Sequence, residues 1–149
     1  MSETHRFERS HDILINAAPE DVLDYVSNPN SWPEWIFASH HIESEDRPLI
    51  TGDTFLEKWH TKTGEAVLNW KVTAWERGKL WIGETHTPFN GTIIARYDVE
   101  KVGDQCKYTR TLINPERPKP ITDKMITAID TEAKASLLNI KKNIEGRNG

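Results

Sequence analysis

Four glycine-containing dipeptides divide the middle of the chain at regular intervals, and they constrain the fold more than any other feature. They are Thr63-Gly64, Arg77-Gly78, Asn90-Gly91 and Gly103-Asp104. The segments between them alternate apolar and polar residues, which indicates strands, and short glycine turns between such strands indicate hairpins. Residues 53–113 are therefore predicted to form a five-stranded antiparallel meander. The strands are expected at 53–61, 66–74, 80–86, 93–99 and 106–112.

The flanking segments add further strands and helices to the meander. Residues 7–16 alternate and predict a first strand, and residues 40–46 predict another. Between them, a proline followed by two acids favours a short helix, and Trp32-Pro33-Glu34-Trp35 favours a second brief one. After three prolines, Thr122 can cap a long helix with one apolar stripe that runs to about Asn143 or beyond. Helices that follow strands without βαβ alternation indicate the α+β class.

Length and composition point to one domain over residues 1–149. The net charge is −4 and the acidic and basic residues are interspersed, which disfavours a nucleic-acid partner. No apolar stretch approaches the roughly 18 residues that a membrane span needs. The single Cys106 cannot form an internal disulfide, and the first residues lack the pattern of a secretory signal. These observations predict a cytoplasmic protein.

Motifs for metals, nucleotides and covalent catalysis are absent from the sequence. His40, His41, His60 and His86 lack the HxxxH or paired-cysteine spacing of metal sites. The chain contains neither GxGxxG nor GxxxxGK[ST], and Cys106 lies in no nucleophile elbow. The sequence therefore predicts no cofactor and no metal.

On each meander strand, the residues of one face are mostly apolar, but four positions on these faces carry polar side chains. The apolar faces should otherwise face a core. Tight turns would bring one residue from each strand into a row across the sheet. The four side chains are Glu57, Glu84, His86 and Arg110. The predicted row is Glu57, Trp70, Glu84, Tyr97 and Arg110.

The register across the Arg77-Gly78 turn is the weakest step in this row. A two-residue loop would place Glu84 opposite Lys71, which breaks the row. A three-residue loop with a bulge would place Glu84 beside Trp70. We prefer the second arrangement because it keeps the apolar phase of every strand on one side of the sheet.

Two interpretations of the polar row remain open, because buried charges must pair or face a wet cavity. In the first, Glu84 and Arg110 form an ion pair beside the Tyr97 hydroxyl inside a filled core. In the second, the polar groups anchor a ligand in a pocket lined by some of the six tryptophans. The ligand-binding residues predicted from the row, the apolar strand phases and the helix stripe are Glu57, Trp59, Trp70, Glu84, His86, Tyr97, Tyr108, Arg110, Met125, Ile129 and Ala133.

Two motifs near the N-terminus resemble those of a known group of proteins. They are Ile13-x-Ile15-x-Ala17-x-Pro19-x-x-Val22 and Asn28-Pro29-x-x-Trp32-Pro33-x-Trp35. Together they resemble the opening of the START-like (SRPBCC) superfamily, and in particular its polyketide cyclase/dehydrase branch. The resemblance implies a helix-grip fold: a curved seven-stranded antiparallel sheet, two short helices after the first strand, and a long helix that closes a deep cavity. Cavity residues vary among such proteins, so no catalytic residue is carried over.

Three functions follow from these observations. The first is binding, and with it transport or sequestration, of a hydrophobic or aromatic small molecule such as a lipid, polyketide or quinone. The second is a cyclase or dehydratase that uses Glu84 or His86 as acid or base and Arg110 to stabilise an enolate. The third is a protein-binding adaptor, like a chaperone partner, suggested by Trp75 and Trp81 on the expected outer face. The same two tryptophans would also suit a homodimer contact.

Overall fold

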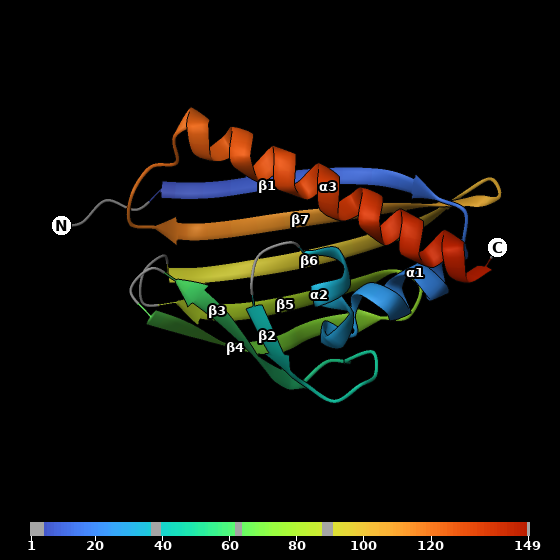
Figure 1. Cartoon of the computed structure of the whole chain (residues 1–149), viewed down its shortest axis with the longest axis horizontal. Helices are drawn as coiled ribbons and strands as arrows, with labels where there is room; N and C mark the ends of the chain where they lie inside the picture. Colours follow the sequence, from blue (N-terminus) through green and yellow to red (C-terminus); the bar gives the residue numbers. More distant parts are fainter. Residues whose placement is uncertain (1–4, 37–39, 62–63, 88–90, 149) are drawn as a thin grey trace.

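A computed structural model describes residues 5–36, 40–61, 64–87 and 91–148 of the chain. Seven strands form one curved antiparallel sheet in the order β1-β7-β6-β5-β4-β3-β2, with the helices on one face (Figure 1). The strands are β1 (His5–Ile15), β2 (His40–Glu43), β3 (Thr54–Thr61), β4 (Gly64–Glu76), β5 (Leu80–Thr87), β6 (Gly91–Val102) and β7 (Gln105–Arg117). The helices are α1 (Pro19–Val26), the 3-10 turn η1 (Pro29–Ser31), α2 (Trp32–Trp35) and α3 (Asp123–Asn148). The predicted α+β class and the predicted meander, β3 to β7, are confirmed.

Four of the five meander strands, β4 to β7, are longer than predicted, and β3 begins one residue later than predicted. Strands β4 and β7 each have 13 residues, and antiparallel strands of this length twist and curl. In contrast, β2 ends at Glu43, three residues before the predicted end. Two of the predicted turns, at Thr63-Gly64 and Asn90-Gly91, fall in part on residues 63 and 90, which lie outside the described residues. The curled sheet provides one wall for the helices to cover.

An aromatic cluster fills the space between α2 and the sheet. The ring of Trp32 lies 5.2 Å from that of Phe55, 5.8 Å from Trp70, 6.2 Å from Trp81 and 6.4 Å from Tyr97, in each case edge to face. Trp81 and Tyr97 are stacked, with ring centroids 5.0 Å apart. Edge-to-face and stacked pairs are the favoured arrangements of aromatic side chains. Trp32 is thus the centre of a core built mainly from rings.

Trp81 belongs to this core, and the expectation that it lies on the outer face is wrong. Its side chain is fully buried, and it lies against the backbone of Gly83. A Cβ atom at position 83 would come within 2.5 Å of the Trp81 ring, so only glycine leaves room for the indole there. Trp75, which is opposite Trp81 in the sheet, is partly buried. The exposed tryptophan pair that suggested the adaptor and homodimer interpretations is therefore not found.

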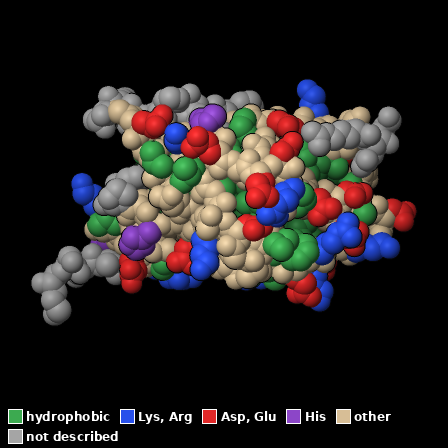
Figure 2. Space-filling model, turned by 90° about the horizontal axis from the view of Figure 1, so that it is seen from below, with side chains coloured by type: hydrophobic (Ala, Val, Ile, Leu, Met, Phe, Trp, Pro, Cys, Tyr) green, Lys and Arg blue, Asp and Glu red, His purple; other side chains and the backbone are tan. Residues whose placement is uncertain are grey.

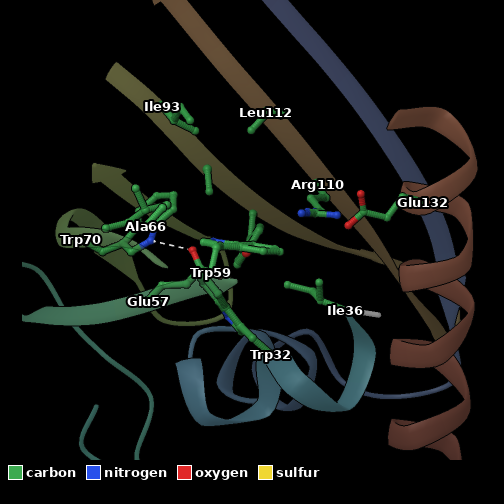
Figure 3. A pocket seen from close by; sticks show the side chains of 13 residues that line it. Trp32, Ile36, Glu57, Trp59, Ala66, Trp70, Ile93, Arg110, Leu112 and Glu132 are labelled. Carbon is green, nitrogen blue, oxygen red and sulfur yellow. Dashed lines mark hydrogen bonds between the residues drawn. The ribbon is translucent and has the colours of Figure 1, made fainter. Parts of the chain in front are cut away.

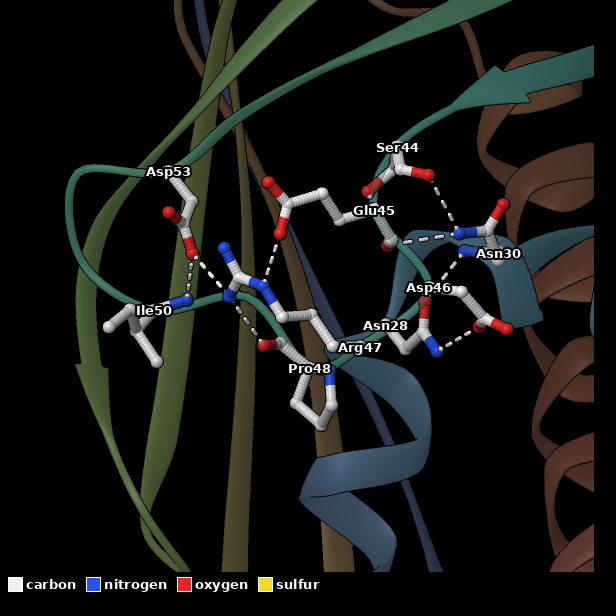
Figure 4. A network of polar contacts seen from close by, with 9 residues as sticks. All are labelled: Asn28, Asn30, Ser44, Glu45, Asp46, Arg47, Pro48, Ile50 and Asp53. Carbon is white, nitrogen blue, oxygen red and sulfur yellow. Dashed lines mark hydrogen bonds and ion pairs between the residues drawn. The ribbon is translucent and has the colours of Figure 1, made fainter.

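A polar network fixes the loop between β2 and β3 against the start of η1 (Figure 4). Asn28 Nδ2 donates to Asp46 Oδ1 at 2.9 Å, and Asn30 Nδ2 donates to two carbonyl groups of the loop at 3.0 and 3.1 Å. Within the loop, Arg47 donates to Asp53 at 2.9 Å and holds the pKa of that carboxyl below its ordinary value. Because α2 follows η1 directly, these contacts fix where the rings of α2 meet the sheet.

Helix α3 packs across β1 and the end of α2. It begins where predicted, since Thr122 Oγ1 accepts a hydrogen bond from the backbone N–H of Met125 at 3.2 Å, and it extends beyond residue 143. The predicted single buried face is confirmed, with positions three and four apart in the core. The buried apolar residues of this face are Ala133, Leu137, Ile140 and Ile144.

Candidate functional site

A cavity of about 420 Å³ lies between the sheet, α2 and α3 (Figure 3). Its walls are mostly aromatic and aliphatic, with a few polar side chains among them. The apolar lining residues are Trp32, Ile36, Trp59, Ala66, Leu68, Trp70, Ile93, Ala95 and Leu112. The polar lining residues are Glu57, Tyr97, Arg110 and Glu132. An apolar wall with a few polar groups is typical of sites for small organic molecules.

Glu57 brings a buried carboxylate to the cavity. It lies on β3 with 2 % of its surface exposed, and its Oε1 accepts a hydrogen bond from Trp70 Nε1 at 3.0 Å. The residue opposite Glu57 is Leu68, so the predicted pairing with Trp70 is wrong by two residues. The long indole nevertheless reaches Glu57 diagonally across the two strands. The hydrogen bond reduces the cost of burying the carboxylate.

Arg110 and Tyr97 lie opposite each other on β7 and β6, as predicted from the Gly103-Asp104 turn. The Arg110 guanidinium carbon is 5.5 Å from the centre of the buried Trp35 ring, which is cation–π distance. Burial raises the pKa of the Tyr97 phenol well above its ordinary value, although the positive charge of Arg110 opposes this shift. Tyr97 therefore remains a neutral hydroxyl over the ordinary pH range.

The β4–β5 register differs from the preferred one, and this moves Glu84 out of the row. The loop is three residues long, as preferred, because Glu76 pairs with Leu80. A shift in pairing between Val72 and Ala74 then places Glu84 opposite Lys71 rather than beside Trp70. Since side chains alternate along a strand, this reverses the face on which Glu84 lies.

Glu84 and His86 consequently point away from the cavity and are exposed. His86 Nδ1 instead contacts Thr92 Oγ1 at 2.7 Å on the outer face. The predicted Glu84–Arg110 ion pair is therefore wrong, and so is the use of Glu84 or His86 as acid or base within the cavity. Glu57 is the fully buried carboxylate that the cavity retains among the described residues.

The remaining predicted residues lie in three different environments. Tyr108 is fully buried in the core beneath Tyr97, with ring centroids 5.8 Å apart, and does not line the cavity. Ile129 and Ala133 line a smaller space of about 70 Å³, here called the adjoining cavity, which shares Arg110, Leu112 and Glu132 with the main one. Met125 lies nearer the start of α3, 39 % exposed, beside Arg117.

Three lining residues that the sequence-based prediction omitted come from the helices or their ends. Trp32 and Ile36 reach the cavity because α2 docks on the sheet, although Trp32 was present in the motif that resembles the START-like superfamily. Glu132 lies beside Ala133 on α3, just off the apolar stripe. The available signal in the sequence was that Glu132 is directly next to a residue of the buried stripe, which favours a polar group at the rim of the cavity.

An ionic contact joins β1 to α3 beside the adjoining cavity. Asp130 accepts hydrogen bonds from Arg9 Nε at 2.9 Å and Arg9 Nη2 at 2.6 Å, and its Oδ1 lies 2.7 Å from His11 Nε2. Arg9, followed by His11, lowers the pKa of the Asp130 carboxyl far below its ordinary value. The first strand and the last helix are therefore connected by an ionised carboxylate.

Replacing Asp130 with asparagine is expected to remove a pH-dependent part of the stability. The folded pKa is lower than that of an unfolded aspartate, about 3.9, so the stabilisation is present above that value and is lost as the pH falls below it. In urea denaturation, the advantage of the wild type over Asp130→Asn should be present at about pH 6 and shrink below about pH 4. Asp12→Asn, at an exposed position of β1, is the control and should change stability less. Equal stability of Asp130→Asn and wild type at pH 6 would contradict the prediction.

The outer surface shows no concentration of one charge on the face seen in Figure 2. Acidic and basic side chains are interspersed there, and hydrophobic side chains form small separate groups. Within the described parts of the chain, no three His, Cys, Asp or Glu side chains gather in a way that would hold a metal ion. None of the helices in those parts has the length and apolar character needed to cross a membrane.

Several solved structures share this architecture at low sequence identity. The Zhui aromatase/cyclase from Streptomyces sp. R1128 is 10 % identical, with a TM-score of 0.72 over 97 % of each chain. The di-domain ARO/CYC StfQ of the steffimycin biosynthetic pathway is 12 % identical, with a TM-score of 0.75 over 97 % of this chain and 52 % of that one. The Aha1 dimer from Colwellia psychrerythraea is 18 % identical, with a TM-score of 0.67 over 93 % of this chain and 96 % of that one.

Identities this low show a common fold and not a common activity. A search of curated protein sequences found no significant match. A family model described as polyketide cyclase / dehydrase and lipid transport matches residues 4–145, nearly the whole chain. The protein therefore belongs to this polyketide cyclase/dehydrase family of START-like helix-grip domains.

Proposed function

We propose that this protein binds a hydrophobic or aromatic small molecule in the main cavity, for transport or sequestration. The observation that carries the proposal is the cavity itself, because its volume of about 420 Å³ lies in the range of small-molecule sites. Its indole and aliphatic walls favour an apolar ring system or chain. The cationic Arg110 favours an anionic or carbonyl group on that molecule.

The walls of the cavity have two properties that suit reversible binding. Tyr97, Arg110 and Glu132 lie together on the side of the cavity formed by β6, β7 and α3. Glu57 lies apart from them on β3, so polar groups are present on both sides of the cavity. The aromatic residues behind them are packed against each other, which gives a preformed site. A preformed apolar pocket binds without a large cost for ordering side chains.

Filling the cavity should weaken binding, and Ala66→Trp is designed to do this. Ala66 lines the cavity on β4, so an indole at this position would occupy the space of a ligand. Titration with phenylnaphthylamine, a neutral dye whose emission rises in apolar surroundings, should show binding to the wild type. The affinity of Ala66→Trp should be lower by at least about tenfold, corresponding to a loss of about 1.4 kcal/mol.

The matched control is Val67→Trp, at the next residue of the same strand. Val67 is 46 % exposed on the opposite face, so this change adds the same indole outside the cavity. Its dye affinity should equal that of the wild type, and circular dichroism should show both variants folded. Dye binding that is absent in the wild type, or unchanged in Ala66→Trp, would refute the proposal.

A further inference from the structure

A third cavity lies at the start of α3, and it is here called the end cavity. Its volume is about 100 Å³. Leu112 lines the main, adjoining and end cavities, Ile93 lines the main and end cavities, and Ile129 lines the adjoining and end cavities. The shared residues place the end cavity directly beside the main one, toward the end of β7. The other lining residues of the end cavity are Phe7, Asn114, Arg117 and Ile121.

The side chains between these cavities are not closely packed. Leu112, Ile93 and Ile129 are each only partly buried, although they lie between the sheet and α3. No residue of α3 before Ala133 is buried, so residues 123–132 of the helix pass above the adjoining and end cavities without close packing. Side chains beside free space change rotamer more readily than those of a close-packed core. An alkyl chain can therefore pass from the main cavity into the end cavity.

A bulge in β7 turns Arg117 toward the end cavity. On β1, His5 and Phe7 are two residues apart and lie on one face. Their partners on β7, Arg117 and Asn114, are three residues apart, so β7 has one extra residue here. Regular alternation would place Arg117 on the face opposite to Asn114, and the bulge returns it to the inner face, where both residues line the end cavity. Bulges are frequent beside active sites, where they redirect a side chain.

Arg117 has no acidic partner among the described residues. Its Nη1 donates to Asn114 Oδ1 at 3.5 Å and its Nη2 to Met125 Sδ at 3.8 Å, which are a long contact and a contact to a weak acceptor. Its Nε is buried and donates to no atom in the described part of the chain. A partly buried guanidinium without a carboxylate is costly, and an anion with two oxygens can satisfy it through two parallel hydrogen bonds. The end cavity therefore favours the acidic end of a ligand.

From these observations we infer that the ligand carries an acidic group on an alkyl chain, which extends from the main cavity past Leu112 and is bound by Arg117. The apolar body of the ligand occupies the main cavity, and the chain lies beneath the start of α3. Arg110 and Arg117 are seven residues apart on β7, so about 20 Å separates their Cα atoms and they form two separate subsites. This inference rests on the proposed function and adds the shape of the ligand and a residue that determines specificity for long acids.

Two naphthalene acids and their primary amides test the inference with the full-length protein. Naphthylacetic acid has its carboxylate near the ring, whereas naphthyldecanoic acid has it at the end of a long chain, and each amide has the length of its acid without the charge. Isothermal titration calorimetry should show naphthyldecanoic acid binding the wild type about tenfold more tightly than its amide, as expected for a charge-assisted pair. Arg117→Gln should reduce this advantage to below about threefold, while the affinity of naphthylacetic acid changes by less than about twofold.

Three further variants test the path of the chain. Arg6→Gln is the matched control, because Arg6 lies at the same end of the sheet, its side chain is 60 % exposed and it lines none of the three cavities, so binding should equal that of the wild type. Arg110→Gln should leave the advantage of the long acid over its amide in place. Ile129→Trp fills the end cavity from a residue that does not line the main one, so it should remove that advantage and leave phenylnaphthylamine binding unchanged. Circular dichroism of each variant checks that the fold is retained.

The possible failures are distinguishable. Equal binding of the long acid and its amide to a wild type that binds phenylnaphthylamine overturns this inference and leaves the proposed function intact. An advantage that persists in Arg117→Gln, or that disappears in Arg110→Gln, also overturns it, because the carboxylate is then bound elsewhere. If neither the naphthalene compounds nor phenylnaphthylamine bind, the proposed function fails together with the inference. The comparison of the long acid with its amide uses the wild type alone, so the test does not depend on a variant that folds.

Discussion

Replacing Trp32 with alanine should lower the free energy of unfolding by about 3–5 kcal/mol, the usual loss for a buried tryptophan. Trp32 is 3 % exposed and contacts rings from α2, β3, β4, β5 and β6. Its Nε1 also donates to the carbonyl of Val26 at 3.0 Å, which ties α2 to the end of α1. The truncation therefore removes ring contacts and leaves a buried carbonyl unpaired.

Urea denaturation of wild type, Trp32→Ala and Trp59→Ala measures this difference. Trp59 is the matched control because it lines the same cavity but is only partly buried. The loss in Trp59→Ala should be the smaller of the two, since fewer contacts and less apolar area disappear. If the two substitutions cost the same, Trp32 is not the centre of the aromatic core.

Replacing Arg110 with glutamine should weaken the binding of an anionic dye by about tenfold or more, because a charge-assisted hydrogen bond in a partly buried site is lost. The dyes are anilinonaphthalene sulfonate and phenylnaphthylamine, which share one ring system and differ in the sulfonate. The neutral dye should bind Arg110→Gln with less than about a twofold change, since the apolar walls are intact. Fluorescence titration at constant ionic strength gives both affinities.

Arg9→Gln provides the matched control for Arg110→Gln. It removes one guanidinium from the adjoining cavity, where Asp130 already neutralises the charge of Arg9. Binding of both dyes to Arg9→Gln should therefore resemble binding to the wild type. If Arg110→Gln lowers the affinity of the neutral dye as much as that of the anionic dye, Arg110 supports the cavity walls rather than binding the anion.

The fold could be predicted from the sequence because its signals are local. The turn at Gly103-Asp104 fixes the pairing of β6 with β7, and with it the position of Tyr97 opposite Arg110, which the structure confirms. The Thr122 cap and the spacing of apolar residues likewise fixed the start and buried face of α3. Each of these features depends on residues within a few positions of each other, so no distant contact can change it.

The site was less predictable because its geometry depends on contacts between distant segments. The shift in pairing between Val72 and Ala74 has no glycine or proline on β4 itself to mark it, yet it decides that Glu84 faces solvent. The alternation of residues along β5 could not decide which of its two faces points into the cavity, because Trp81 and Ile82 lie on opposite faces and both are apolar. Glu132 enters the cavity lining only through the docking of α3, which no local pattern specifies.

The pairing of β1 with β7 affects how this protein is made. These strands are next to each other in the sheet although the rest of the meander separates them along the chain. During synthesis on the ribosome, β1 therefore emerges early and must wait, with an unpaired edge, until β7 has been translated. Such non-local pairing favours slow folding, in milliseconds to seconds, and leaves a nascent chain exposed to aggregation.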